Sequence, residues 1–221
     1  MDSGWHAFVL DHSAFPESDD EVFLRHIGAY GRSLYDSAGC AGRRRDILYA
    51  HLLLGYAYHV FTGKPVGSLV IGRNANGKPY SQDDGGFCFS ISHSKGHVAV
   101  AVCESDIGID IEKLRVADVR LPNRIFSAAE LLFLNGSRNK TKAFLEVWTR
   151  KESIVKFTGS GLSGISKADS FADDWRNFVH SIEFDGCIIT VCCKARKVGS
   201  RGFPIMEIRR TELFDFFNGN D

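Results

Sequence analysis

The chain combines a long apolar helical segment with a pair of strand segments twice, once in each half, and this repetition constrains its fold most. In the first half, Asp46–Phe61 is long and apolar enough for a mostly buried helix, and apolar strand segments follow it. In the second half, Lys140–Phe157 has the length and pattern of a helix, and Asp185-Gly186 is a turn between two strand segments. We therefore expect an α+β fold with two similar halves, residues 1–105 and residues 106–221.

The other elements are assigned from residue period, turn residues and helix caps. The sequence Ser127-Ala-Ala-Glu130 has the pattern of a capping box, which begins a helix. Strands are expected over residues 5–10, 68–72, 78–80, 87–92, 97–104, 107–114, 182–184, 187–193 and 205–209. Helices are expected over residues 21–34, 46–61, 128–134 and 140–157. Each half should therefore pack an antiparallel sheet on helices.

The net charge and the distribution of apolar residues exclude several classes of protein. Twenty-seven basic residues balance twenty-seven acidic ones, so no overall positive field would attract nucleic acid. No stretch is apolar enough to cross a bilayer, and the first residues lack the pattern of a secretion signal. The six cysteines include no CxxC pair and are expected to pack mostly as reduced thiols. We expect a cytoplasmic protein without nucleic-acid or membrane partners.

Two acidic side chains share one face of the strand expected over residues 107–114. Residues two apart on a strand project to the same side about 7 Å apart, so Asp110 and Glu112 point in the same direction. Two neighbouring carboxylates are costly without a cation, although they could also form the polar face of an edge strand. The isoleucines between them favour a covered strand.

A second acidic position lies on the helix expected over residues 140–157. Trp148, Glu152 and Lys156 are spaced four residues apart and therefore form one stripe. The pair of Glu152 and Lys156 is either a surface ion pair or a third carboxylate ligand beside a phosphate-binding lysine. Three carboxylates with water and phosphate oxygens suit Mg²⁺, whereas Zn²⁺ prefers histidine or cysteine.

Two further segments have the chemistry to bind an anion. One is the strand end at Ser92 and His93, which offers a hydroxyl and an imidazole. A serine–histidine nucleophile pair is the alternative, but no GxSxG motif surrounds the serine. The other is the basic run at residues 43–45, at the beginning of a helix, where backbone N–H groups favour anions. This run is either part of a phosphate site or a solvated basic turn.

These residues belong to a set of short motifs that occur in a characteristic order. The motifs are Gly77-Lys78-Pro79, Phe89-Ser-Ile-Ser92-His93-Ser94, Gly108-Ile-Asp110-Ile-Glu112 and Trp148-x-x-Lys151-Glu152-x-x-x-Lys156. In order and spacing the set resembles the surfactin-synthetase type of 4′-phosphopantetheinyl transferase. The likeness extends over residues 77–164, and Arg45 with the leucine-rich helix after it continues the likeness towards the N-terminus.

The resemblance implies a pseudo-dimer of two α+β halves with coenzyme A bound in the cleft between them. Arg45, Lys78 and His93 match positions near the 3′-phosphate of coenzyme A, and the Gly77-Lys78-Pro79 segment matches the border of the adenine site. Ser92 belongs to the same expected coenzyme A site. The other basic residues that could bind the 3′-phosphate are Arg25, Arg32, Arg43 and Arg44.

The resemblance also implies a reaction, in which the phosphopantetheine group moves from coenzyme A to a serine of an apo carrier protein and 3′,5′-ADP leaves. Asp110, Glu112 and Glu152 match the Mg²⁺ ligands of the family, and Lys156 matches the lysine that contacts the pyrophosphate. Glu152, or a metal-bound water, would then take the proton of the carrier serine. Glu152 and Lys156 are thus the expected catalytic residues.

The expected partner is an acyl, peptidyl or polyketide carrier protein. Carriers of this kind are usually acidic, and Lys113–Phe126 mixes basic with apolar side chains, so we expect this segment to dock the carrier unless it is a solvated loop. Because each half would supply what a second subunit supplies elsewhere, we expect a monomer. The rival functions are a metal-dependent nucleotide pyrophosphohydrolase and a non-catalytic module that binds coenzyme A or a carrier.

Overall fold

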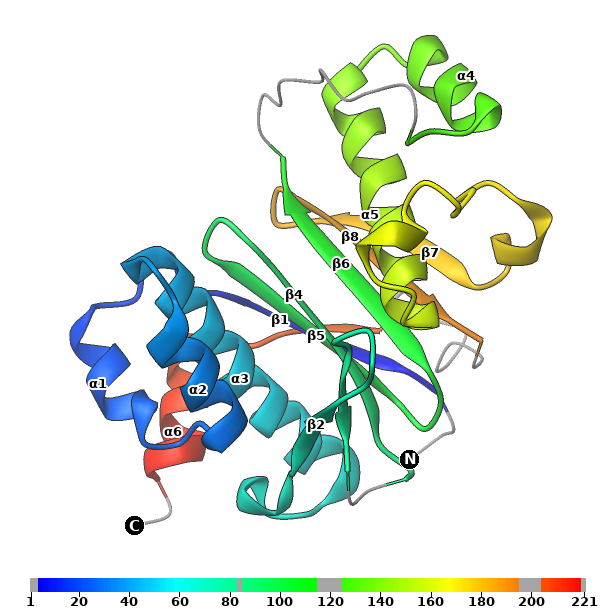
Figure 1. Ribbon diagram of the computed structural model, residues 1–221. Coiled ribbons are helices and arrows are strands. Elements are labelled where there is room, and N and C mark those ends of the chain that lie inside the picture. The colour runs from blue at the N-terminus through cyan, green and yellow to red at the C-terminus, as the bar shows by residue number, and fades with distance from the viewer. Residues whose placement is uncertain (1–3, 83–84, 115–124, 195–203, 220–221) are drawn as a thin grey trace.

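Two sheets pack against each other, and each has a long helix on its outer face (Figure 1). This computed structural model describes residues 4–82, 85–114, 125–194 and 204–219. The strands are β1 His6–Asp11, β2 Ile71–Arg73, β3 Pro79–Ser81, β4 Cys88–Ser94, β5 His97–Cys103, β6 Ile107–Lys113, β7 Val179–Phe184, β8 Cys187–Cys193 and β9 Ile205–Glu207. The helices are α1 Ser18–Leu24, α2 Ala29–Ser37, α3 Ala41–Thr62, α4 Ala128–Gly136, α5 Lys140–Thr158 and α6 Arg210–Asn218. The mixed α+β class expected from the sequence is thereby confirmed.

The first sheet has the strand order β4-β5-β1-β9 and carries α3. Its strand β5 is buried along its whole length because both faces are covered. Val98, Val100 and Val102 pack into the core cluster that contains α3, whereas Ala99 and Ala101 pack against the second sheet. The uncharged alternation of alanine and valine therefore reflects a strand with two apolar neighbours.

The second sheet has the strand order β6-β8-β7 and carries α5. In β6, the three isoleucines Ile107, Ile109 and Ile111 are fully buried against the first sheet. The alternate positions turn the other way, so Gly108 and Asp110 face α5. The strand period therefore places an acidic residue at the contact between sheet and helix.

Gly108 lets α5 approach β6 closely. A Cβ atom at this position would lie 2.0 Å from the carbonyl oxygen of Ser153 and 2.5 Å from the backbone nitrogen of Phe157, both in α5. Because these atoms are backbone, Gly108→Ala should displace the helix and lower the free energy of unfolding by roughly 2–3 kcal/mol. Urea unfolding measures this loss. Gly42→Ala, where a Cβ atom meets nothing within 4 Å, should leave the midpoint unchanged or raise it.

Two expected helices differ from those observed. The single helix expected over residues 21–34 is wrong, because the structure has α1 and α2 with a break before Gly28, whose backbone is extended (ψ 170°). The helix expected to begin at Asp46 begins at Ala41 instead, so the three arginines at positions 43–45 lie inside the first turns of α3. Their side chains therefore leave the helix in different directions.

The last described segment returns to the first sheet. The strand expected over residues 205–209 forms as β9, but it pairs in parallel with β1. The following helix α6 packs on α3, and Arg210 donates to Asp19 over 2.6 and 2.8 Å. β9 and α6, which follow residue 105, therefore pack on elements that precede it. The expected division of the chain at residue 105 stays a prediction. Among the described residues, no helix combines the length and the apolar character needed to cross a membrane.

Candidate functional site

The two acidic residues of β6 are fixed by hydroxyls of β4, which belongs to the other sheet. Ser92 Oγ donates to Asp110 Oδ1 over 2.7 Å, and Ser94 Oγ donates to Glu112 Oε2 over 2.7 Å. The backbone N–H of Ile109 donates to Ser90 Oγ over 3.1 Å. Alternate serines of β4 therefore hold β6 alongside it and orient both carboxylates.

Helix α5 adds a base and a third acid to this pair. Lys156 Nζ donates to Asp110 Oδ1 over 2.8 Å and to Ser92 Oγ over 2.9 Å. Glu152 lies one turn earlier on the same helix. Trp148, a further turn away, packs instead in an apolar cluster with Phe144. The expected stripe is thus present, but its aromatic member belongs to the core.

The environment of Glu152 indicates a crowded group of carboxylates. Burial raises the pKa of Glu152, and the charge of Asp110 and then that of Glu112 act in the same direction, whereas Lys156 lowers it. Asp110 Oδ2 is buried and has no hydrogen-bond partner among the described residues. A cation would relieve both conditions, so the donor set fits a hard divalent ion such as Mg²⁺.

The oxygens of the three acids do not yet converge on one point. Among the described residues, they do not form a group whose ligand atoms all lie within 4.8 Å of one another. Ligands of one Mg²⁺ at about 2.1 Å lie at most about 4.2 Å apart. Holding one ion therefore requires a side-chain rotation, and Glu152, which is only partly buried, has room for it.

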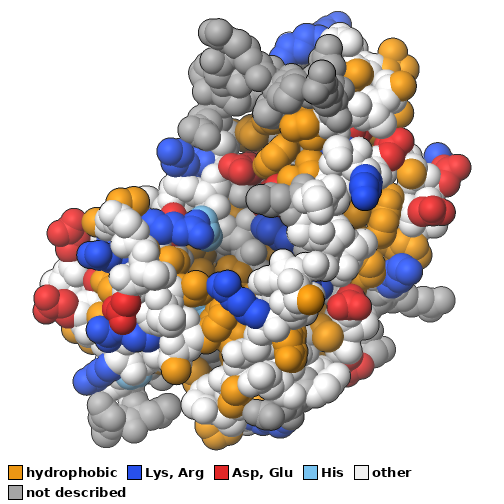
Figure 2. All heavy atoms as spheres, in the orientation of Figure 1, with side chains coloured by type: hydrophobic (Ala, Val, Ile, Leu, Met, Phe, Trp, Pro, Cys, Tyr) orange, Lys and Arg blue, Asp and Glu red, His pale blue; other side chains and the backbone are white. Residues whose placement is uncertain are grey.

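A cavity of about 300 Å³ lies beside this group, at the small end of the range for ligand pockets. The Gly77-Lys78-Pro79 segment lines one side, and Glu152 and Lys156 line another. Basic side chains gather along the middle of the face in Figure 2, between the parts of the molecule built around α3 and α5. Some of the sequence-predicted residues from each half therefore border one space, namely Gly77, Lys78, Pro79, Glu152 and Lys156.

The turn that contains Lys78 is held against the end of α5. Lys78 Nζ donates to the carbonyl oxygen of Phe157 over 3.0 Å, and Asn76 Nδ2 donates to that of Gly159 over 2.8 Å. Gly77 has a φ of +84°, a conformation that favours glycine. The expected hairpin of β2 and β3 therefore connects the first half to the carbonyl end of α5.

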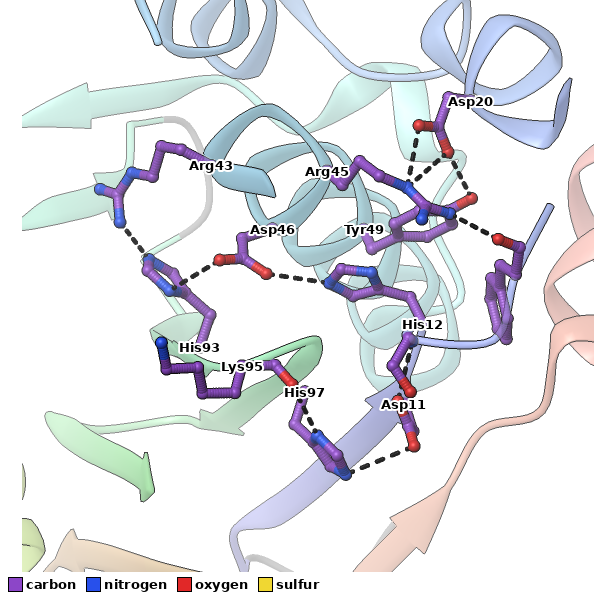
Figure 3. Close-up of polar contacts among 12 residues, drawn as sticks. Asp11, His12, Asp20, Arg43, Arg45, Asp46, Tyr49, His93, Lys95 and His97 are labelled. Atoms are coloured by element: carbon purple, nitrogen blue, oxygen red, sulfur yellow. Dashed lines mark hydrogen bonds and ion pairs between the residues drawn. The ribbon is translucent and has the colours of Figure 1, made fainter. Parts of the chain in front are cut away.

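His93 lies in a polar network with α3, which Figure 3 shows. Arg43 Nη1 donates to His93 Nε2 over 2.7 Å, so Nδ1 carries the proton and faces Asp46 Oδ2 at 3.6 Å. The other carboxylate oxygen of Asp46 lies 3.0 Å from His12 Nε2. Burial lowers the pKa of His93, and Arg43 also lowers it, while Asp46 opposes the shift.

Arg45 points to a different place from the one the sequence suggested. Its Nε lies 3.0 Å from Asp20 Oδ2, and its Nη2 donates to the carbonyl oxygen of Phe15 over 2.9 Å. Arg43 is the arginine of this run that contacts His93 (Figure 3). The role expected for Arg45 stays a prediction, and Arg43 becomes the better-placed candidate.

Sequence reasoning missed two residues of this network and could not place another segment. Asp46 and His12 had no local signal, because their partners are 34 or more residues away in the chain. Most of the expected docking segment Lys113–Phe126 lies outside the described residues. A second, larger cavity of about 800 Å³ between α2, α3 and α6 has no acidic residue among its described lining residues. It therefore lacks the carboxylates of the group described above.

Comparisons with known proteins point to one family of enzymes. Residues 106–198 match the model of the 4′-phosphopantetheinyl transferase superfamily. The chain is 31% identical over 121 residues to 4′-phosphopantetheinyl transferase psf-1 of Bacillus pumilus. The aligned region covers 54% of this chain and 52% of that protein. It is 32% identical over 159 residues to 4′-phosphopantetheinyl transferase gsp of Aneurinibacillus migulanus, covering 71% and 61%. It is 33% identical over 133 residues to 4′-phosphopantetheinyl transferase AcpT of Salmonella typhimurium, covering 58% and 66%. The matched region thus spans between about half and two thirds of these relatives.

Proposed function

Because the chain belongs to the 4′-phosphopantetheinyl transferase superfamily, we propose that it transfers the phosphopantetheine group of coenzyme A to a serine of an apo carrier protein. The observation that supports this most is the meeting of Asp110, Glu152 and Lys156 at the cavity bordered by the Gly77-Lys78-Pro79 segment. The second product is 3′,5′-ADP. The chain works as a monomer. Its two halves, residues 1–105 and 106–221, form a pseudo-dimer on either side of the cavity.

The three acidic residues have a common role in this proposal. Asp110, Glu112 and Glu152 would hold Mg²⁺, which would offset the negative charge of the pyrophosphate and of the leaving nucleotide. Lys156 contacts the same phosphates, and its ammonium is already directed to this point by Asp110 and Ser92. The serines of β4 keep these groups oriented before substrate binds.

The proton of the carrier serine has a nearby acceptor in Glu152. A carboxylate can accept a proton through either of its two oxygens, so Glu152 offers a proton acceptor beside the ion that the three acids would hold. The serine oxygen then attacks the phosphorus that carries the pantetheine arm, and the bond to the bridging oxygen of the pyrophosphate breaks. Lys156 is placed to stabilise the charge that accumulates on the leaving 3′,5′-ADP.

Arg43 and His93 are proposed to bind the 3′-phosphate of coenzyme A. We expect Arg43→Ala and His93→Ala each to raise the KM for coenzyme A by about tenfold, because each removes one charge-assisted or neutral hydrogen bond to phosphate. Initial rates against 3′-dephospho-coenzyme A provide the control, since this substrate lacks the phosphate. If the variants lost equal activity on both substrates, these residues would not bind the 3′-phosphate.

Carrier docking near Lys113–Phe126 predicts a different kinetic signature. Charge reversal at Arg115 and Arg120 should raise the KM for an acidic carrier by about tenfold while leaving the KM for coenzyme A unchanged. Initial rates with each substrate varied in turn measure both constants. Equal effects on the two constants would argue against docking at this segment.

The rival function as a pyrophosphohydrolase is separated from transfer by one assay. A transferase releases 3′,5′-ADP from coenzyme A only when an apo carrier is present, whereas a hydrolase releases it with water alone. Chromatographic quantification of 3′,5′-ADP with and without carrier distinguishes the two. Binding of coenzyme A without release under either condition would indicate a non-catalytic binding module.

A further inference from the structure

A second group of metal-ligating side chains lies where three chain turns meet. Asp11 ends β1, His97 begins β5, and Asp185 occupies the turn between β7 and β8. One ligand atom from each of these three residues lies within 4.8 Å of the other two. His97 is paired with Asp11 in the register of β1 and β5, and Figure 3 shows their side chains in contact.

The histidine of this group is buried and oriented. His97 is 2% exposed, and its Nδ1 lies 3.4 Å from the carbonyl oxygen of Lys95. A carbonyl oxygen only accepts, so Nδ1 carries the proton and the lone pair of Nε2 points to the two carboxylates. This is the arrangement in which metal-binding histidines are usually held, with the second ring nitrogen bonded to a backbone carbonyl.

The two distances from the histidine nitrogen to the carboxylates match those between ligands of one small metal ion. His97 Nε2 lies 3.3 Å from Asp185 Oδ2 and 3.5 Å from Asp11 Oδ2. Ligands at about 2.0–2.2 Å from a tetrahedral Zn²⁺ lie about 3.3–3.6 Å from each other. We propose that Asp11, His97 and Asp185 form a Zn²⁺ site, separate from the acidic group at α5, whose remaining position takes a water molecule.

A neighbouring lysine offsets the negative charge of the two carboxylates when the site holds no metal. Three acceptor atoms face one another, and the ammonium of Lys113 lies 3.0 Å from His97 Nε2. Lys113 lies on the same face of β6 as the three isoleucines, and Glu112 lies on the opposite face. A zinc ion binds in place of this ammonium, and one imidazole nitrogen with two carboxylate oxygens favours zinc over Mg²⁺ or Ca²⁺.

The ligands are positioned before the metal arrives. Ser13 N donates to Asp11 Oδ1 over 2.8 Å, which leaves Oδ2 directed to His97. The backbone N–H of Leu114 donates to the carbonyl oxygen of Gly186 over 2.8 Å and holds the turn of Asp185. Asp11 and His97 belong to the first sheet and Asp185 to the second, so the bound ion links the two sheets.

Zinc titration calorimetry tests the site directly. The protein carries Cys40→Ser, which removes the exposed thiol, and the buffer contains excess Mg²⁺ to occupy the acidic group at α5. We expect one Zn²⁺ per chain and a higher midpoint of thermal unfolding with Zn²⁺. Asp185→Asn should weaken binding by about tenfold or more, since it replaces a charged carboxylate ligand by a neutral amide. Asparagine tolerates the positive φ of 46° at this position, so the variant should fold.

Two further variants distinguish a metal site from a simple ion-pair network. Lys113→Gln should tighten Zn²⁺ binding, because the competing ammonium is gone, whereas an ion-pair network would only lose stability. Asp173→Asn, at a carboxylate that is 87% exposed and pairs with Arg176, should change nothing. Absence of stoichiometric Zn²⁺ binding, or undiminished binding by Asp185→Asn, would overturn the proposal.

Discussion

Replacing Glu152 by glutamine is expected to lower kcat/KM for carrier modification by about 10²- to 10⁴-fold, the usual contribution of a general base. The amide has nearly the same size, but it neither takes a proton nor binds a cation well. Asp110→Asn should raise the Mg²⁺ concentration needed for half-maximal rate, because it weakens the buried ligand whose Oδ2 has no partner in the part of the chain that the structure describes. Single-turnover formation of holo-carrier across a Mg²⁺ series measures both effects.

A carboxylate on the same helix provides the control. Glu146 lies in α5, six residues before Glu152, and Glu146→Gln should retain the unmodified rate. The decisive comparison is the combination of Glu152→Gln with Asp110→Ala. If this double variant still formed holo-carrier at the unmodified rate, the assignment of the metal ligands would be wrong.

The second large effect concerns stability, and it comes from the residue directly before Glu152. Lys151 is 1% exposed, and its Nζ donates to Glu130 over 2.9 and 3.1 Å and also to the carbonyl oxygen of Ala168. Glu130 is fully buried and accepts from the backbone N–H groups of Ser127 and Ser170, each over 2.8 Å. Lys151→Met or Glu130→Gln alone should cost about 3–5 kcal/mol, because each leaves an unpaired buried charge.

Double-mutant analysis separates this explanation from simple loss of contacts. Lys151→Met together with Glu130→Gln leaves no buried charge, so it should cost less than the sum of the single variants by more than about 1 kcal/mol. Urea unfolding measures the coupling. The exposed pair of Lys142 and Glu183, 2.7 Å apart, is the control, and Lys142→Met should hardly move the midpoint. Strict additivity of the Lys151 and Glu130 variants would contradict the buried-pair account.

Local patterns predicted the elements that depend on neighbouring residues. The capping box at Ser127 and Glu130 is present, and the turn at Asp185-Gly186 joins β7 to β8. Strand and helix periods also predicted that Asp110 shares a face with Glu112 and that Lys156 shares a stripe with Glu152. These features follow from backbone geometry over a few residues, which a sequence displays directly.

Long-range pairing was outside the reach of the same patterns. Nothing near Ile205–Glu207 indicates a parallel partner in β1, and nothing near Lys151 indicates a buried partner 21 residues away. The choice between Arg43 and Arg45 depends on how α3 is rotated about its axis and on where it begins. Such features depend on packing between elements, which no single segment encodes.

The mass of a carrier protein after incubation with coenzyme A and Mg²⁺ tests the central claim most directly. A panel of apo acyl, peptidyl and polyketide carriers is analysed by intact-protein mass spectrometry, alongside versions in which the acceptor serine is alanine. The account predicts that at least one carrier gains the mass of a single phosphopantetheine group, that its serine-to-alanine version gains none, and that Glu152→Gln greatly slows the gain. Release of 3′,5′-ADP with no mass added to any carrier would contradict it.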